Sequence, residues 1–302
     1  MKIFHKILGK LNSKLNYSLG LSHILNYRAN YSKIQNLNDL DYKVFSQNGE
    51  DGIIDYLLYC LDIDKPKFVE IGIGDYSECN SRFIYQRTSP NGLVIDCLES
   101  LESKVSKNIK LWKGDLKIIE TKITSNNILK ILKENSFLND LDFFSLDIDG
   151  VDYWVLNEMP KEFCKVAVIE YNSVFGPDLK ITVPNLENFD RTNYHYSNLC
   201  FGASLKAVVN LMIDKKFKFM GTNLTRCNAF FISEKYADKV KINIPDPKNL
   251  LVHTNSNFRE SRDQNGSLSF ISGKDRLKKI DECDVIDLSN NNKKTKIKDL
   301  TI

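Results

Sequence analysis

The feature that most constrains the fold is an alternation of short apolar segments with longer amphipathic ones. The apolar segments suit strands, and the stretches between them, such as 49–61 and 203–215, have a helical pattern. The expected strands are residues 68–71, 92–95, 118–123, 143–148 and 166–169. Strands that alternate with helices predict an α/β chain with a parallel sheet covered on both faces.

Two further apolar segments, 217–220 and 229–232, end this pattern. Too few residues separate them for a crossover helix, so we expect an antiparallel hairpin at the end of a mostly parallel sheet. The chain then divides into an N-terminal helical extension and linker (1–44), a ligand-binding domain (45–235) and a C-terminal extension (236–302). The tail beyond Asp284 is polar and rich in Asn and Lys, which predicts disorder.

The composition argues against several classes of protein. Of the 302 residues 42% are hydrophobic and the formal net charge is only +3, so bulk charge does not favour nucleic acid as a partner. No stretch approaches the ~20 apolar residues that an integral membrane segment needs. The seven cysteines are dispersed without a C-x-x-C pair, which predicts free thiols in a reducing compartment. We expect a cytoplasmic protein.

The first 25 residues combine regularly spaced lysines with apolar residues. The lysines interrupt the apolar run that a secretory leader requires. The apolar positions 4, 7, 8, 11 and 15 fit one face of an amphipathic helix. We expect this face to pack on the domain or on a partner subunit, which would give a homo-oligomer through the helix. A membrane-surface anchor is the alternative.

A glycine-containing loop follows the first expected strand. Gly72 and Gly74 let the backbone turn tightly and approach a ligand, and Asp96 ends the next strand, where a carboxylate can hold a ribose. Ser77 stands where a dinucleotide fingerprint has its third glycine. Acidic residues around the loop, Glu70 among them, disfavour a pyrophosphate and favour a cationic ligand such as S-adenosylmethionine. A plain turn that uses its glycines for packing is the alternative.

The chain resembles the FkbM-related bacterial methyltransferases in the order of many short motifs between residues 45 and 270. These are FSQNGEDGII (45–54), FVEIG (68–72), NS (80–81), GLVID (92–96), SLDIDGVDYW (145–154), VIEYN (168–172), FGASL (201–205), NAFF (228–231) and FRESRD (258–263). The resemblance implies a Rossmann-like class I methyltransferase fold that binds S-adenosylmethionine. With it, the expected cofactor-binding residues are Gln47, Glu70, Gly72, Gly74, Asn80, Ser81, Asp96 and Asp147.

Oxygen-bearing side chains follow the fourth and fifth expected strands. Asp147 and Asp149 stand at the C-terminal end of the fourth expected strand, and Glu170 and Asn172 stand at the end of the fifth. Carboxylate and amide oxygens suit a hard divalent cation such as magnesium, and we expect Asp149, Glu170 and Asn172 as its ligands. Without a metal, a carboxylate such as Asp149 could remove the proton of an acceptor hydroxyl. Helix capping and loop hydrogen bonding are the plain alternative.

The long polar insertion 171–200 has the position of a substrate lid. His195 within it is a second candidate catalytic residue, and Asn172, Arg259 and Arg262 are candidate contacts to the acceptor. We therefore expect O-methylation of a hydroxyl on a polar small molecule or glycan, such as a sugar or capsule precursor. The alternatives are a nucleotide-dependent oxidoreductase and a non-catalytic binding or assembly protein with a degenerate methyltransferase fold.

Overall fold

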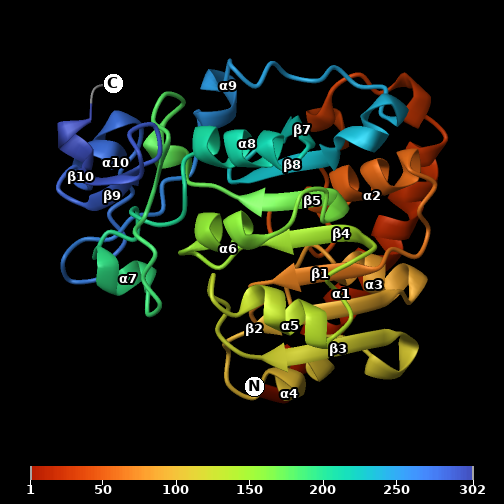
Figure 1. Cartoon of the computed structure of the whole chain (residues 1–302). Helices are drawn as coiled ribbons and strands as arrows, with labels where there is room; N and C mark the ends of the chain where they lie inside the picture. The colour runs from red at the N-terminus through yellow and green to blue at the C-terminus, as the bar shows by residue number, and fades with distance from the viewer. Residues whose placement is uncertain (1, 301–302) are drawn as a thin grey trace.

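The computed structural model describes residues 2–300 and centres on a seven-stranded sheet (Figure 1). The strands lie in the order β3-β2-β1-β4-β5-β8-β7. Their bounds are β1 Phe68–Ile71, β2 Asn91–Asp96, β3 Asp115–Glu120, β4 Leu141–Leu146, β5 Cys164–Glu170, β7 Phe217–Thr222 and β8 Asn228–Ser233. The first five run parallel, and β8 pairs antiparallel with both β5 and β7. The predicted Rossmann-like α/β architecture, a mostly parallel sheet with a terminal antiparallel hairpin, is confirmed.

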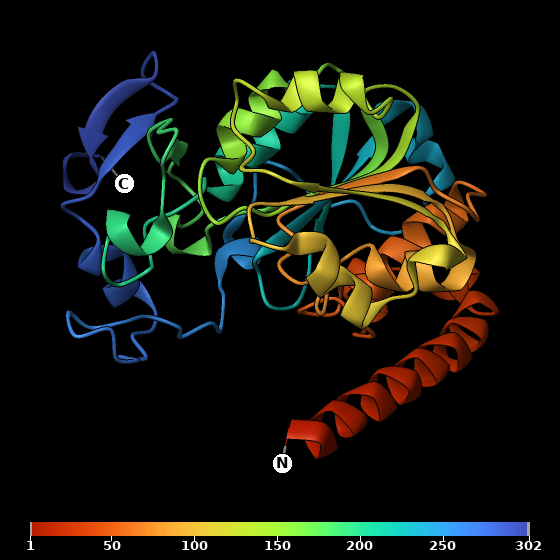
Figure 2. The same cartoon turned by 90° about the horizontal axis from the view of Figure 1, so that it is seen from below.

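Helices cover both faces of this sheet, as Figure 2 shows. One face carries α5 Ile128–Glu134, α6 Asp152–Glu158 and α8 Leu205–Asp214. The other carries α2 Glu50–Cys60, α3 Arg82–Thr88 and α4 Leu101–Asn108. The remaining helices are α1 Lys2–Arg28, α7 Arg191–Tyr194, α9 Leu251–Thr254 and α10 Lys274–Lys279. The chain therefore forms a three-layer α/β/α domain with extensions at both ends.

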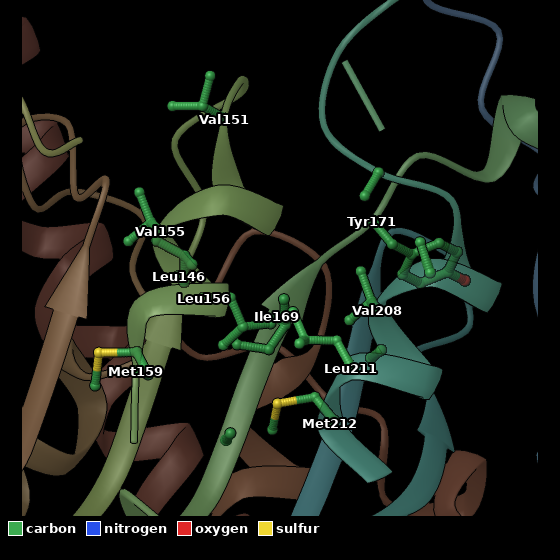
Figure 3. Packing of buried hydrophobic residues seen from close by; sticks show 14 of the residues in the cluster. Leu146, Val151, Val155, Leu156, Met159, Ile169, Tyr171, Val208, Leu211 and Met212 are labelled. Atoms are coloured by element: carbon green, nitrogen blue, oxygen red, sulfur yellow. The ribbon is translucent and has the colours of Figure 1, made fainter. Parts of the chain in front are cut away.

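Alternation along the strands divides the buried residues between the two faces. In β4, Phe144 packs with α5 and α6, and its neighbour Phe143 packs with the helices on the opposite face. Figure 3 shows the first of these clusters, where Leu156 of α6 and Met212 of α8 meet Ile169 of β5. Because both faces of the sheet are covered, the central strands β1, β4 and β5 are mostly buried, whereas the edge strand β3 is not.

The C-terminal extension forms a second sheet, so the predicted disorder beyond Asp284 is wrong. Strand β9 (Asp284–Asp287) pairs antiparallel with β10 (Lys293–Lys296) and with β6 (Ile181–Thr182) of the insertion. Val285 is fully buried, and the hydroxyl of Tyr194 donates to the carbonyl of Asp284 at 2.6 Å. A polar composition did not reveal this order, because backbone pairing with a distant strand supplies it.

The segment 26–44, expected as a linker, is also part of the packed structure. Helix α1 continues to Arg28, which forms an ion pair with the buried Asp55 of α2 at 2.8 Å. Tyr31, Leu37 and Leu40 are buried in the same cluster as α2. Among residues 2–300, no helix combines the length and apolarity needed to cross a membrane.

Two strands begin and end earlier than their apolar residues predicted. Strand β3 was expected over 118–123 and spans Asp115–Glu120, because its pairing with β2 sets Asn91 opposite Asp115. Strand β4 was expected over 143–148 and ends at Leu146, the last residue paired with β5. Asp147 therefore begins a loop.

Candidate active site

A cavity of about 790 Å³ lies at the carboxyl ends of β1 to β4. The strand order reverses between β1 and β4, which is where ligands bind in open α/β sheets. The size suits a small molecule. Insertion residues 189–192 and Asn198, together with Glu260, also line it. Six of the predicted site residues line this cavity: Gln47, Gly72, Gly74, Asp96, Asp147 and Asp149.

The glycine loop joins the ends of three strands. Gly72 has a positive φ of 86°, and its amide donates to the carbonyl of Ile95 at 2.9 Å. A Cβ at Gly72 would lie 1.5 Å from the carbonyl oxygen of Asp147, so only glycine fits there. Gly74 also has a positive φ, of 53°, but a Cβ there would meet open space. Both glycines line the cavity, but Gly72 is required for close backbone packing, whereas Gly74 has open space beside its α-carbon.

Asp96 organises the rim of the cavity at the end of β2. One carboxylate oxygen accepts from the amide of Gly74 at 2.7 Å, and the other accepts from the amide of Leu98 at 2.8 Å. Each oxygen keeps a further lone pair, since a carboxylate offers about four acceptor sites. The side chain can therefore hold the loop and still accept from the hydroxyls of a ligand.

Glu70, Asn80 and Ser81, expected to bind the cofactor, lie outside the cavity. Glu70 is only 4% exposed, and its carboxylate accepts from the amides of Asn80 and Ser81, both at 2.8 Å, and from the Ser81 hydroxyl. Burial raises the pKa of Glu70 to about 7, although these donors act in the opposite direction. The three residues fix the ends of the glycine loop, which corrects the expectation that they contact a cofactor.

Three carboxylates converge beyond β4 and β5. Oxygen atoms of Asp147, Asp149 and Glu170 all lie within 4.8 Å of one another. Burial and the neighbouring acids raise the pKa of Asp147 and that of Glu170. Within residues 2–300, one oxygen of Glu170 is buried without a hydrogen-bond partner. This group can hold either a proton or a cation.

Asp149 is the exposed member of these acids. It adopts a positive φ of 53°, which Asp tolerates better than most residues, and its carboxylate forms an ion pair with Arg191. Asp152 holds the same turn, since its oxygens accept from the amides of Ile148 at 2.8 Å and Gly150 at 2.9 Å. The turn thus presents Asp149 to the cavity, although the strand has already ended.

Asn172 does not join the carboxylates, contrary to its expected roles as a metal ligand and an acceptor contact. The residue is 2% exposed, and its side-chain oxygen accepts from the amide of Val174 at 3.0 Å. Its side-chain amide donates to the carbonyls of Leu199 at 2.8 Å and Phe201 at 3.0 Å. Asn172 therefore fastens the base of the insertion to β5.

His195, Arg259 and Arg262 also lie outside the cavity. The His195 ring stacks on Tyr196 and its Nδ1 is 2.7 Å from the Ser197 hydroxyl, and burial together with Lys279 lowers its pKa. The guanidinium of Arg259 donates to the carbonyl of Phe270, and that of Arg262 to the carbonyl of Gly266. These contacts hold surface loops, so the geometry does not support the expected catalytic and acceptor-binding roles.

Arg191 is the functional candidate that the sequence did not reveal. It begins the short helix α7, its guanidinium lies 3.8 Å from the centre of the Phe201 ring, and its Nε donates to the carbonyl of Asn198 at 2.7 Å. The only signal for Arg191 in the sequence is its position within the insertion 171–200. Its partner Asp149 lies 42 positions away in the chain.

The lining of the cavity is strongly acidic. Seven acidic residues and two basic ones face it. The acids are Asp75, Glu78, Asp96, Asp147, Asp149, Asp190 and Glu260, and the bases are Lys122 and Arg191. Such a lining attracts a cationic ligand and repels a pyrophosphate.

No protein-family model and no curated protein matches the chain. Among solved structures, it is similar to an O-methyltransferase family protein from Burkholderia thailandensis (11% identity, TM-score 0.36, 61% of this chain and 59% of that one). It is also similar to human N-acetylserotonin methyltransferase in complex with S-adenosylmethionine (12%, 0.34, 59% and 50%). A third is an S-adenosylmethionine-dependent methyltransferase from Clostridium acetobutylicum (9%, 0.39, 72% and 98%). The chain spans less than two thirds of the first two, and likenesses this distant carry no argument about activity or substrate.

Proposed function

We propose that this chain is an S-adenosylmethionine-dependent methyltransferase that acts on a hydroxyl group of a polar acceptor. The observation that carries the proposal is the acidic cavity at the strand reversal, with the glycine loop and Asp96 on one side and Asp149 on the other. This arrangement joins a site for a cationic ligand to a group that can take a proton.

The residues of the cavity fit S-adenosylmethionine. Gly74 leaves open space at the rim, and Asp96 keeps acceptor sites for ribose hydroxyls. Gln47 is exposed at the same cavity and can hydrogen-bond a polar group. The excess of carboxylates suits the positive charges of this cofactor, which when bound supplies an activated methyl group.

The chain's own residues then bind and deprotonate the acceptor. Asp149 faces the cavity and is 55% exposed at its side chain, so it can accept a proton from a hydroxyl. Arg191 neutralises and orients this carboxylate, held in place by Phe201 and Asn198. Alignment of the reacting groups provides most of the remaining rate.

A divalent cation such as magnesium fits the carboxylate cluster. Asp147, Asp149 and Glu170 would hold it, and the unpartnered oxygen of Glu170 is suited to a hard cation. Such an ion lowers the pKa of a bound hydroxyl. Asn172 is not included, because its side chain is fully engaged elsewhere.

Polar side chains in the cavity lining support a proposal about the acceptor class. Asp190, Arg191, Thr192, Asn198 and Glu260 can hydrogen-bond several hydroxyls, as a sugar requires. This reading agrees with the resemblance to the FkbM-related methyltransferases, and a sugar or glycan precursor is the acceptor we propose.

The test combines binding with transfer of a radiolabelled methyl group to nucleotide sugars and oligosaccharides. We expect calorimetric binding of S-adenosylmethionine but not of NAD, and a methyl ether in the product. Asp149→Ala should lower turnover by about 10²-fold or more without weakening the binding of S-adenosylmethionine. His195→Ala is the matched control and should keep full activity.

Four outcomes would contradict the proposal. Binding of NAD alone would indicate the oxidoreductase alternative. Methyl transfer to nitrogen or carbon would exclude a hydroxyl acceptor, and full activity of Asp149→Ala would remove its assigned role. Failure to bind either ligand would favour a non-catalytic binding protein.

A further inference from the structure

Helix α1 presents a row of leucines that its own domain leaves uncovered. Leu11, Leu15 and Leu19 are 58%, 57% and 60% exposed, and Leu25 is 72% exposed. The first three are four residues apart, so they follow one side of the helix. Three leucines in such a row, with Leu25 exposed further along the same helix, form an apolar surface that isolated exposed residues do not.

The opposite side of α1 packs on the domain. Gly20 allows the close approach, since a Cβ there would lie 2.7 Å from a methyl group of Val44. The Tyr17 ring contacts Phe83 edge-on, and Ile24 packs with Val44. The apolar face predicted from residues 4, 7, 8, 11 and 15 is therefore not the packing face, because Leu11 and Leu15 point away from the domain.

The N-terminal part of α1 extends beyond the domain, as Figure 2 shows. The guanidinium of Arg82 marks the point of departure, because it donates to the Ser13 hydroxyl at 3.0 Å and to the carbonyls of Asn108 and Ser77. Ser77 lines the cavity. The free part of the helix thus begins close to the rim of the candidate active site.

The charged side chains in the sequence of α1 are basic, and none is acidic. The first acidic residue of the chain is Asp39, and lysines occur at every fourth position from 2 to 14. These lysines therefore recur in the sequence at the four-residue spacing typical of a helix. An apolar row with an acid-free, lysine-rich remainder is the pattern of helices that lie on anionic membranes.

A second basic surface adjoins α1 at Asn108. Residues 103–114 contain four lysines and no acid, and Lys107, Lys110 and Lys113 are exposed. Trp112 in this segment is 78% exposed. Trp is enriched where proteins meet the membrane interface, and lysines there contact anionic headgroups.

We infer that α1 docks on an anionic membrane surface, with its leucine row in the interface and its lysines among the headgroups. The helix lies on the surface and does not span the bilayer. The domain packs on the side of the helix opposite the leucines, so it does not obstruct this contact. A second copy of the chain is disfavoured, because pairing two leucine rows would bring together two lysine-rich segments without an acid to compensate.

Flotation of the full chain with vesicles tests this inference. We expect it to float with phosphatidylcholine–phosphatidylglycerol vesicles at low salt and to remain unbound with pure phosphatidylcholine. High salt should release it, because the Debye length falls to about 3 Å at 1 M. The triple substitution Leu11→Ser, Leu15→Ser and Leu19→Ser should lower binding at least about tenfold, and so should replacement of Lys2, Lys6, Lys10 and Lys14 by Gln.

The matched control carries Leu251→Ser, Val252→Ser and Leu268→Ser, three exposed apolar residues far from α1 in sequence. It should bind vesicles like the unsubstituted chain. Thermal melting of each variant checks that the fold is intact. The inference is overturned if the chain stays unbound at low salt, if the leucine variant binds as well as the control variant, or if the same leucines mediate a stable dimer in the absence of lipid.

Discussion

At the scale of single residues, the two loop glycines have different tasks. Position 72 must be glycine, because a Cβ at this position would overlap the backbone carbonyl of Asp147. Even Gly72→Ala should therefore prevent correct folding of the loop. Gly74 has free space around its α-carbon and lines the cavity. A substitution at Gly74 therefore probes ligand binding, whereas one at Gly72 probes the fold.

Gly74→Leu should weaken binding of S-adenosylmethionine at least tenfold, because the side chain would enter the cavity. The positive φ should cost only about 1–2 kcal/mol of stability. Calorimetry gives the affinity and urea unfolding gives the stability. Unchanged affinity in a folded Gly74→Leu protein would show that the ligand does not occupy this side of the loop.

At the scale of elements, the insertion and the C-terminal extension depend on each other. Strand β6 of the insertion pairs with β9, and the hydroxyl of Tyr194 donates to the carbonyl of Asp284. The insertion also carries Arg191 to the cavity. Strand β9 thus supports a wall of the candidate active site without lining it.

Removal of residues 284–302 should loosen the insertion and leave the central sheet folded. Within residues 2–300, no strand of the seven-stranded sheet pairs with β9 or β10. Limited proteolysis should cut within 171–204 much faster in the truncated chain, with circular dichroism nearly unchanged. Equal cleavage rates would show that β9 contributes little to the order of the insertion.

At the scale of the whole molecule, buried carboxyl groups set the response to pH. Burial raises the pKa of Asp51 to about 6 and that of Glu70 to about 7, above the ordinary values of 3.8 and 4.5. Between those values the folded chain holds protons that the unfolded chain has released. The free energy of unfolding should therefore fall as the pH rises from about 5 to 8.

Glu70→Gln should reduce this fall by about 2.5 kcal/mol, the contribution expected from its pKa shift. The variant should also be less stable at every pH, because its amide cannot accept all three hydrogen bonds. Urea unfolding at pH 5 and pH 8 measures the difference, and Glu102→Gln, at an exposed position, is the control. A pH response identical to that of the control would contradict the assigned pKa.

The sequence by itself determined the order of strands and helices, the terminal hairpin and the positions where loops meet the cavity. Local signals suffice for these, because apolar periodicity and glycines act over a few residues. Gly74, Asp96 and Asp149 could be placed at the cavity because strand ends of a parallel sheet share one edge.

The tertiary structure decided which polar residues face a ligand and which hold the backbone. From the sequence, Glu70 was expected to bind the cofactor and Asn172 a metal ion and the acceptor. Both side chains are buried and form hydrogen bonds with backbone amides and carbonyls instead. Arg191 reaches Asp149 from 42 residues away, and β9 gains its order from β6, more than 100 residues earlier. Such contacts depend on which chain segments pack together, and neither composition nor local periodicity records that pairing.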